Sequence, residues 1–177
     1  MGGTIRYHQF IAFSFTAIIG TLLHFLSDWT GQQPLVGAVS AVNESVWEHM
    51  KLLYVPMLIV ALVQRLLLGG QHRCFWCMKL AGIVTGLALI PMLYYTYTGA
   101  LGLRFSWVDI SIYYLAAAAA YLMEGYLRRS EHRRNCPFEV PAIVMIIAIG
   151  FVFLVLTFYP PRIPLFQDPV TQLYGLP

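Results

Sequence analysis

The stretch from Pro137 to Tyr159 reads PFEVPAIVMIIAIGFVFLVLTFY and carries a single charged residue, Glu139. A helix needs about 20 mostly apolar residues to cross a hydrocarbon core of about 30 Å, so this stretch predicts a transmembrane helix. Four further stretches meet the same requirement: His8–Leu26, Trp47–Leu68, Phe75–Gly99 and Trp107–Leu127. The expected fold is therefore an all-α, polytopic membrane helix bundle with five transmembrane helices.

The composition of the chain excludes several classes of protein. Of its 177 residues, 59% are hydrophobic and only 11% are charged, and the mean hydropathy is +0.68. A soluble domain carries roughly 25% charged residues, so a soluble or disordered chain is excluded. The net charge of +3, without clustered Lys and Arg, also excludes a nucleic-acid partner. Membrane lipid is the expected surrounding.

Two segments allow a second interpretation. The first stretch could be a cleaved signal peptide, but it exceeds the apolar core of about 7–15 residues that such signals have, so we expect a retained span. After the bundle of residues 1–159, residues 160–177 contain repeated prolines together with apolar residues such as Phe166. We expect this tail to pack over the outer mouth of the bundle; the alternative is a segment lying loosely at the lipid headgroups.

The Lys and Arg residues predict the orientation, because cytoplasmic loops of membrane proteins carry an excess of them. Eight of the 11 fall at one end of the expected bundle. These eight are Arg6, Arg65, Arg73, Lys79, Arg128, Arg129, Arg133 and Arg134. We therefore expect a multi-pass protein of the cytoplasmic membrane, with a cytoplasmic N-terminus and an extracytoplasmic C-terminus.

Small residues mark two places where helix backbones can approach closely. They are the run Ala116–Ala120 and the pair Gly82 and Gly86. We expect packing within one bundle, and a homo-oligomer interface is the alternative.

Most of the acidic residues gather at the other, outer end, where only Lys51, Arg104 and Arg162 are available as partners. The spacing of His24 and Asp28 places both on one helix face, and Glu44, Glu48 and His49 lie at the start of the second span. The antiparallel turn brings the two groups to one depth. Carboxylates and imidazoles on facing helix ends suit Zn²⁺ or another divalent metal. We predict His24, Asp28 and His49 as metal ligands and Glu44 or Glu48 as the general base, with Asp109 and Asp168 as additional candidates.

A structural interpretation explains part of this pattern. Ser45-x-x-Glu48 is a capping box, in which the two side chains satisfy helix N-terminal amides. Lys51 follows Glu48 by three residues and could pair with it. At the opposite end, Cys74 and Cys77 form a C-x-x-C pair that could be a dithiol or half of a zinc site. The expected cytoplasmic placement argues against a stable disulfide there.

The motifs around His24-x-x-x-Asp28-Trp29, Asn43–His49 and the proline-rich tail resemble an uncharacterised family of small bacterial five-span membrane proteins. The resemblance implies the five-span layout and a bacterial membrane, and it supplies no catalytic residues. In the use of His and Asp from helix ends, the outer group is also similar to membrane zinc hydrolases of the alkaline ceramidase and adiponectin-receptor type. Their seven spans and H-x-x-x-H pair are absent here, so this likeness concerns chemistry alone.

Three functions remain open from the sequence. The first is a metal-dependent, membrane-embedded hydrolase or transferase acting on a lipid or other amphipathic substrate, with zinc or a similar ion as cofactor. The second is a non-enzymatic membrane subunit that binds a partner or a lipid headgroup. The third, a small-solute carrier, is weakened by the scarcity of ionisable groups deep in the spans and by the lack of an inverted repeat.

Overall fold

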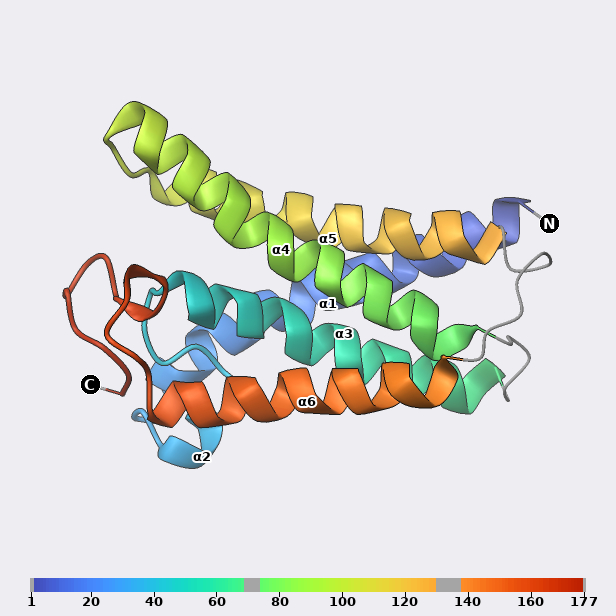
Figure 1. The fold of residues 1–177 in the computed structure, drawn as a ribbon, viewed down its shortest axis with the longest axis horizontal. Helices are drawn as coiled ribbons and strands as arrows, with labels where there is room; N and C mark the ends of the chain where they lie inside the picture. Colours follow the sequence, from blue (N-terminus) through green and yellow to red (C-terminus); the bar gives the residue numbers. More distant parts are fainter. Residues whose placement is uncertain (1, 69–73, 130–137, 177) are drawn as a thin grey trace.

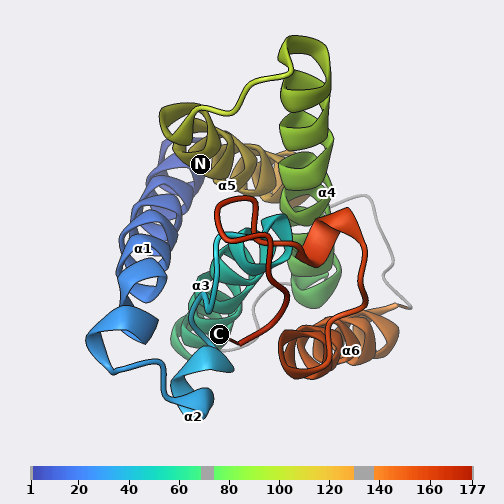
Figure 2. The same ribbon diagram turned by 90° about the vertical axis from the view of Figure 1, so that its left-hand side faces the viewer.

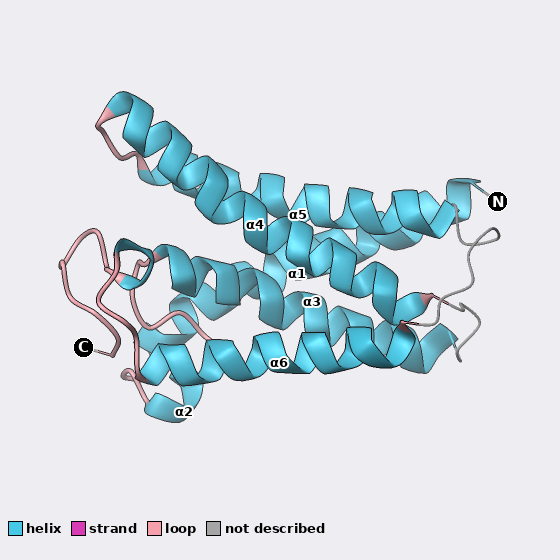
Figure 3. Ribbon diagram, viewed as in Figure 1, coloured by secondary structure: helices cyan, strands magenta, loops and turns pink. Residues whose placement is uncertain are grey.

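The computed structural model describes residues 2–68, 74–129 and 138–176, and within these the chain is helical with irregular connections (Figures 1 and 3). Five long helices follow one another: α1 (Gly2–Trp29), α3 (Val46–Leu68), α4 (Phe75–Leu101), α5 (Ser106–Arg129) and α6 (Glu139–Phe158). Two short elements, α2 (Pro34–Gly37) and the 3₁₀ turn η2 (Pro164–Phe166), belong to the connections. The all-helical prediction is confirmed.

The five long helices are each long and apolar enough to cross a membrane. Their candidate spans are Tyr7–Trp29, Val46–Leu67, Phe75–Leu101, Ser106–Arg129 and Glu139–Phe158, so the five-span prediction is confirmed. The first helix extends beyond the predicted His8–Leu26 and therefore includes Asp28. The predicted start of the last span at Pro137 lies outside the described residues, as do Arg73, Arg133 and Arg134.

The helices run antiparallel, so the bundle has two chemically different ends. We call the acidic end the one where α1, α4 and α6 finish and α3 and α5 begin, and the basic end the opposite one (Figure 1). Viewed along the helices, α3 lies in the middle, with α1, α5, α4 and α6 around it (Figure 2). The orientation of the two ends in a membrane stays a prediction.

The two small-residue patches predicted from the sequence meet each other inside the bundle. A Cβ atom added to Gly86 would lie 3.3 Å from the Ala120 Cβ and 3.4 Å from the Ala116 carbonyl oxygen. The side chains of Ala116, Ala117 and Ala120 are fully buried. Because glycine has no side chain, these positions of α4 allow α5 to approach closely, and the contact lies within one chain.

The tail returns across the acidic end (Figure 2). Phe166 is buried, with its ring centroid 4.7 Å from that of Trp47 at the start of α3, and Trp47 also packs on Phe153 of α6 at 4.6 Å. The Asn43 side-chain amide donates to the Gly175 carbonyl at 2.9 Å. An aromatic stack and a polar contact therefore attach the tail to the α2–α3 connection and to α3 itself.

Candidate functional site at the acidic end

A cavity of about 580 Å³ opens at the acidic end between α1, the start of α3 and the start of α5. One part of its wall is apolar or aromatic and includes Phe25, Leu52, Ile110 and Tyr114. The other part is polar. The polar lining residues include Thr21, His24, Glu44, His49, Arg104, Ser106 and Asp109. The cavity therefore combines an apolar wall with a charged wall.

Two histidines from different helices face one carboxylate. His24 Nε2, from α1, lies 3.4 Å from Glu44 Oε1, and His49 Nε2, from α3, lies 3.8 Å from Glu44 Oε2. The two imidazole centroids are 5.6 Å apart. The side chains are 28%, 19% and 41% exposed for His24, His49 and Glu44, so they are half-buried and accessible from the cavity. The prediction placed these three residues at one depth, and the structure brings them together.

The local sequence fixes the ring of His49. The Ser45 backbone N–H donates to Asn43 Oδ1 at 2.9 Å, and the Glu48 N–H approaches Ser45 Oγ at 3.4 Å, which starts α3 at this point. The Ser45 carbonyl lies 2.9 Å from His49 Nδ1. Because a carbonyl oxygen can only accept, Nδ1 carries the hydrogen. In the neutral ring, Nε2 then presents its lone pair to Glu44.

The hydrogen bond to Ser45 therefore sets both the tautomer and the direction of the His49 ring. Imidazole ligands of metals are commonly oriented in this way, by a hydrogen bond from their other nitrogen. Arg104 already places a positive charge 4.0 Å from the Glu44 oxygen that His49 faces.

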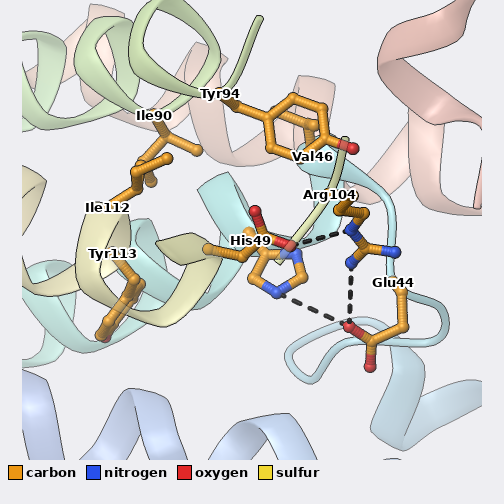
Figure 4. Close-up of a pocket in the computed structure, with 9 residues that line it drawn as sticks. Glu44, Val46, His49, Ile90, Tyr94, Arg104, Ile112 and Tyr113 are labelled. Carbon is orange, nitrogen blue, oxygen red and sulfur yellow. Dashed lines mark hydrogen bonds and ion pairs between the residues drawn. The ribbon is translucent and has the colours of Figure 1, made fainter. Parts of the chain in front are cut away.

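Arg104 and Asp109 form the second polar group of the cavity. Figure 4 shows a small neighbouring pocket in which the Arg104 guanidinium and the His49 ring both approach Glu44. Arg104 Nε donates to Asp109 Oδ2 at 2.8 Å, and its Nη2 lies 4.0 Å from Glu44 Oε2. The Tyr97 hydroxyl donates to Asp109 Oδ1. Burial lowers the pKa of Arg104, but the hydrogen bond and charge of Asp109 raise it by more, so the net shift is upward. Arg104 thus keeps its positive charge beside Glu44.

Glu48 is placed differently from Glu44, although both were candidate bases. Its side chain is 2% exposed, and Oε2 lies 2.6 Å from Lys51 Nζ, which is fully buried. The Val42 N–H donates to Oε2 at 3.1 Å, and the Thr157 hydroxyl donates to Oε1 at 3.2 Å. Lys51 also donates to the Gly37 carbonyl at 2.7 Å and to Thr157 Oγ1 at 2.9 Å. Glu48 therefore ties α3 to α6 and to the α2 region.

Asp28 lines a neighbouring cavity of about 210 Å³, which it shares with Glu44, Asn43 and Asp168. Glu44, in the wall between the two cavities, is the carboxylate that contacts the histidines. Asp168 is a backbone cap: its Oδ1 accepts from the N–H groups of Val170 at 2.7 Å and Thr171 at 3.2 Å. Burial raises the pKa of Asp168, but these N–H donors lower it by more.

Arg104, Tyr97 and Tyr113 were not predicted as parts of a site. Arg104 lies in the short connection before α5 and precedes Asp109, in the first turn of that helix, by five residues; this spacing of opposite charges was the available signal. Nothing in the sequence singled out the two tyrosines, because the direction of a side chain depends on how its helix is rotated in the bundle. In the part of the chain that the structure describes, no group of three or more His, Cys, Asp or Glu side chains is arranged to hold a metal ion as it stands.

At the basic end, Cys74 is disulfide-bonded and Cys77 is free and half-buried. Because Cys77 is free, the C-x-x-C pair is not closed by a disulfide between its own two cysteines. The Cys77 N–H approaches Glu139 Oε1 at 3.4 Å, which links α4 to α6.

Comparison with known proteins gives one informative match. No curated protein and no solved structure matches the chain. The expectation of an uncharacterised family of small five-span proteins is confirmed by a family model that covers residues 4–176. Over nearly its whole length, the chain thus belongs to the family of unknown function DUF6512.

Proposed function

We propose that the protein is a membrane-embedded hydrolase or transferase that acts on an amphipathic, lipid-like substrate at the acidic end of the bundle. The cavity of about 580 Å³ has the size of a ligand site, since such sites range over roughly 300–1,000 Å³. Its apolar wall suits an acyl or isoprenoid chain, and its polar wall suits the headgroup. A lipid can reach such a cavity from the bilayer without leaving the apolar phase.

The observation that carries the proposal is the pair of imidazoles directed at Glu44. We propose that a divalent metal such as zinc binds between His24, His49 and Glu44. At a tetrahedral ion with bonds of about 2.0–2.1 Å, neighbouring ligand atoms are about 3.3 Å apart. The distance of 3.4 Å from His24 Nε2 to Glu44 Oε1 fits this value. The distance of 3.8 Å from His49 Nε2 is to the other oxygen, Oε2, so the half-buried Glu44 side chain must rotate to bring one oxygen to both imidazoles.

The proposed ion has three protein ligands and one open position, which is the pattern of catalytic rather than structural zinc. A water in that position has a pKa near 7 when the ion is bound, so it supplies a nucleophile at neutral pH. Arg104, which stays charged beside Glu44, would stabilise negative charge that develops on the substrate. In this arrangement Glu44 takes the place predicted for Asp28, and Glu48 has a structural role.

Metal analysis of the purified protein tests the metal site. We expect a stoichiometric divalent metal in the wild type and its loss in His24→Ala and His49→Ala. His8→Ala is the matched control, because His8 lies exposed on the same helix as His24 at the opposite end. A wild type without metal after supplementation with zinc, or an unchanged metal content in both variants, would overturn the metal site.

The substrate class is tested separately by mass spectrometry of lipids. Proteoliposomes of mixed bacterial phospholipids are incubated with wild type, with His49→Ala and with His8→Ala, and the lipids are then analysed for new products. Products formed by wild type and His8→Ala but not by His49→Ala would support the enzyme. A lipid that copurifies and is not altered would instead favour the non-enzymatic subunit that binds a headgroup.

A further inference from the structure

At the basic end, a buried ion pair leaves one carboxylate oxygen without a partner among the residues that the structure describes. Lys79 Nζ of α4 lies 2.5 Å from Glu124 Oε2 of α5, and both side chains are at most 7% exposed. Glu124 Oε1 is buried and accepts no hydrogen bond from residues 2–68, 74–129 or 138–176. It borders a small cavity of about 20 Å³, also lined by Gln9, Gln64 and Arg128. A water needs about 10–15 Å³, so the cavity has room for one water that donates to Oε1.

The backbone around Glu124 is shaped to admit these polar groups. A Cβ atom on Gly82 would lie 2.6 Å from Glu124 Cγ, and one on Gly125 would lie 2.1 Å from Gln9 Oε1. Both glycines therefore leave space that a larger residue would fill. Arg128 lines the same cavity as the Lys79–Glu124 pair. Two cations beside one carboxylate disfavour a bound metal cation, so water or a proton is the expected guest.

From this pair, a series of buried hydroxyl groups follows the α1–α5 interface toward the acidic end. Lys79 Nζ lies 5.7 Å from the centre of the Tyr121 ring. Tyr121 Oη is 2.6 Å from Thr16 Oγ1, and the Tyr113 hydroxyl donates to the Thr16 carbonyl at 3.2 Å. Tyr113 in turn lines the large cavity that contains His49. Thr16 thus stands between the two tyrosines.

The series covers about half of the thickness of a membrane. Tyr113 and Glu124 are 11 residues apart on α5, which is about 16 Å of helix, or half of a hydrocarbon core of about 30 Å. The hydroxyl of Tyr113 occupies space that Gly20 leaves open, since a Cβ atom there would lie 1.8 Å from it. Buried hydroxyls also hold helices together, so the assay must separate conduction from packing.

We propose that Tyr113, Thr16, Tyr121 and Glu124 form a proton path between the cavity at the acidic end and the small cavity beside Arg128. Each hydroxyl accepts a proton on one side and releases its own on the other, so the hydroxyls stay neutral. The path requires the Tyr113 hydroxyl, which donates to the Thr16 and Leu52 carbonyls in the structure, to turn to the Thr16 hydroxyl. It also requires a water between Tyr121 and Glu124. Glu124 Oε1 accepts the proton and passes it to water beside Arg128. This inference does not depend on the proposed enzymatic function.

The test measures proton entry into proteoliposomes that contain a pH-sensitive dye and are driven by a potassium diffusion potential. We compare wild type, Tyr121→Phe and Glu124→Gln with protein-free vesicles. Tyr126→Phe is the matched control, because Tyr126 is an exposed tyrosine on the same helix. We expect flux in wild type and Tyr126→Phe, and a fall to the protein-free level in the other two variants.

Tyr121→Phe keeps the ring and removes one hydroxyl, so it tests the path even if Glu124→Gln does not fold. Thermal unfolding in detergent checks that the Tyr121→Phe protein is intact. Wild-type flux equal to that of protein-free vesicles would overturn the proposal. Flux in folded Tyr121→Phe equal to wild type would also overturn it and assign these hydroxyls to helix packing. The assay needs no added metal or lipid substrate, so its result is independent of the test of the acidic-end site.

Discussion

Replacing Lys51 by Met tests whether Glu48 has a structural role. The ammonium group of Lys51 makes three contacts in a fully buried place: Glu48 at 2.6 Å, the Gly37 carbonyl at 2.7 Å and Thr157 Oγ1 at 2.9 Å. Lys51→Met leaves Glu48 as a buried charge without its partner. Removing one member of a buried ion pair costs about 3–5 kcal/mol, and we expect Lys51→Met to lower the free energy of unfolding by that amount.

The double variant Glu48→Leu/Lys51→Met gives the matched comparison. Replacing a whole buried pair by apolar residues is often neutral or even stabilising, although here the Val42 N–H and the Gly37 carbonyl would lose partners. We expect the double variant to be more stable than Lys51→Met alone, so the two substitutions are not additive. Arg162→Met is the control for loss of a positive charge, because Arg162 is exposed in the tail.

The measurement is unfolding in detergent, followed by tryptophan fluorescence, since Trp47 packs close to the pair at the start of α3. A Lys51→Met protein as stable as the Arg162→Met control would refute the reasoning. A double variant whose loss of stability equals the sum of the two single losses would refute it as well. In either case, the role of Glu48 as a general base would have to be considered again.

Three further predictions concern the tail, helix packing and the orientation. The pKa of Asp168 is lower in the folded protein than in the unfolded chain, so its cap stabilises the tail above the unfolded pKa and is lost as the pH falls through the folded pKa. We therefore expect protease cleavage of the tail to increase in acid. Asp168→Asn should remove this pH dependence and leave the tail sensitive to protease at neutral pH. Gly20→Ala would place a Cβ 1.8 Å from Tyr113 Oη, and this overpacking should lower the free energy of unfolding by about 1–3 kcal/mol. Gly99→Ala is the control and should not destabilise the protein, because a Cβ at Gly99 would have nothing within 4 Å. Equal stabilities of the two variants would contradict the α1–α5 packing. A protease-cleavable tag after the tail should be cut in intact spheroplasts, and a tag cut only after lysis would reverse the orientation predicted from Lys and Arg.

Several features of the site followed from the sequence because they are local. The spacing of Ser45 and Glu48 predicted the start of α3, where the Glu48 N–H approaches Ser45 Oγ. The spacing of Glu48 and Lys51 made their pairing a possibility, and the two side chains do pair. Neighbours within one helical turn are set by the helix geometry alone, so no tertiary information was needed.

The choice among the carboxylates did not follow from the sequence. Glu44 and Glu48 are four residues apart, and both looked equally able to act as a base. Thr157 comes from α6 and Val42 from the preceding loop, and these contacts bury Glu48, while Glu44 faces the histidines in the cavity. Part of this difference depends on Thr157, which lies more than a hundred positions from Glu48 in the sequence, and local spacing does not predict such a contact.

The sequence by itself determined that this chain is a five-span helical bundle with a charge difference between its ends. Lipid leaves backbone groups unsatisfied unless they bond within a helix, so the length and apolarity of each stretch are sufficient to predict it. Only the tertiary structure decided which distant polar groups meet: His24 and His49 at Glu44, and Lys79 at Glu124. The physical reason is that these contacts join different helices or different faces of one helix, and their distances are set by how the helices rotate and pack.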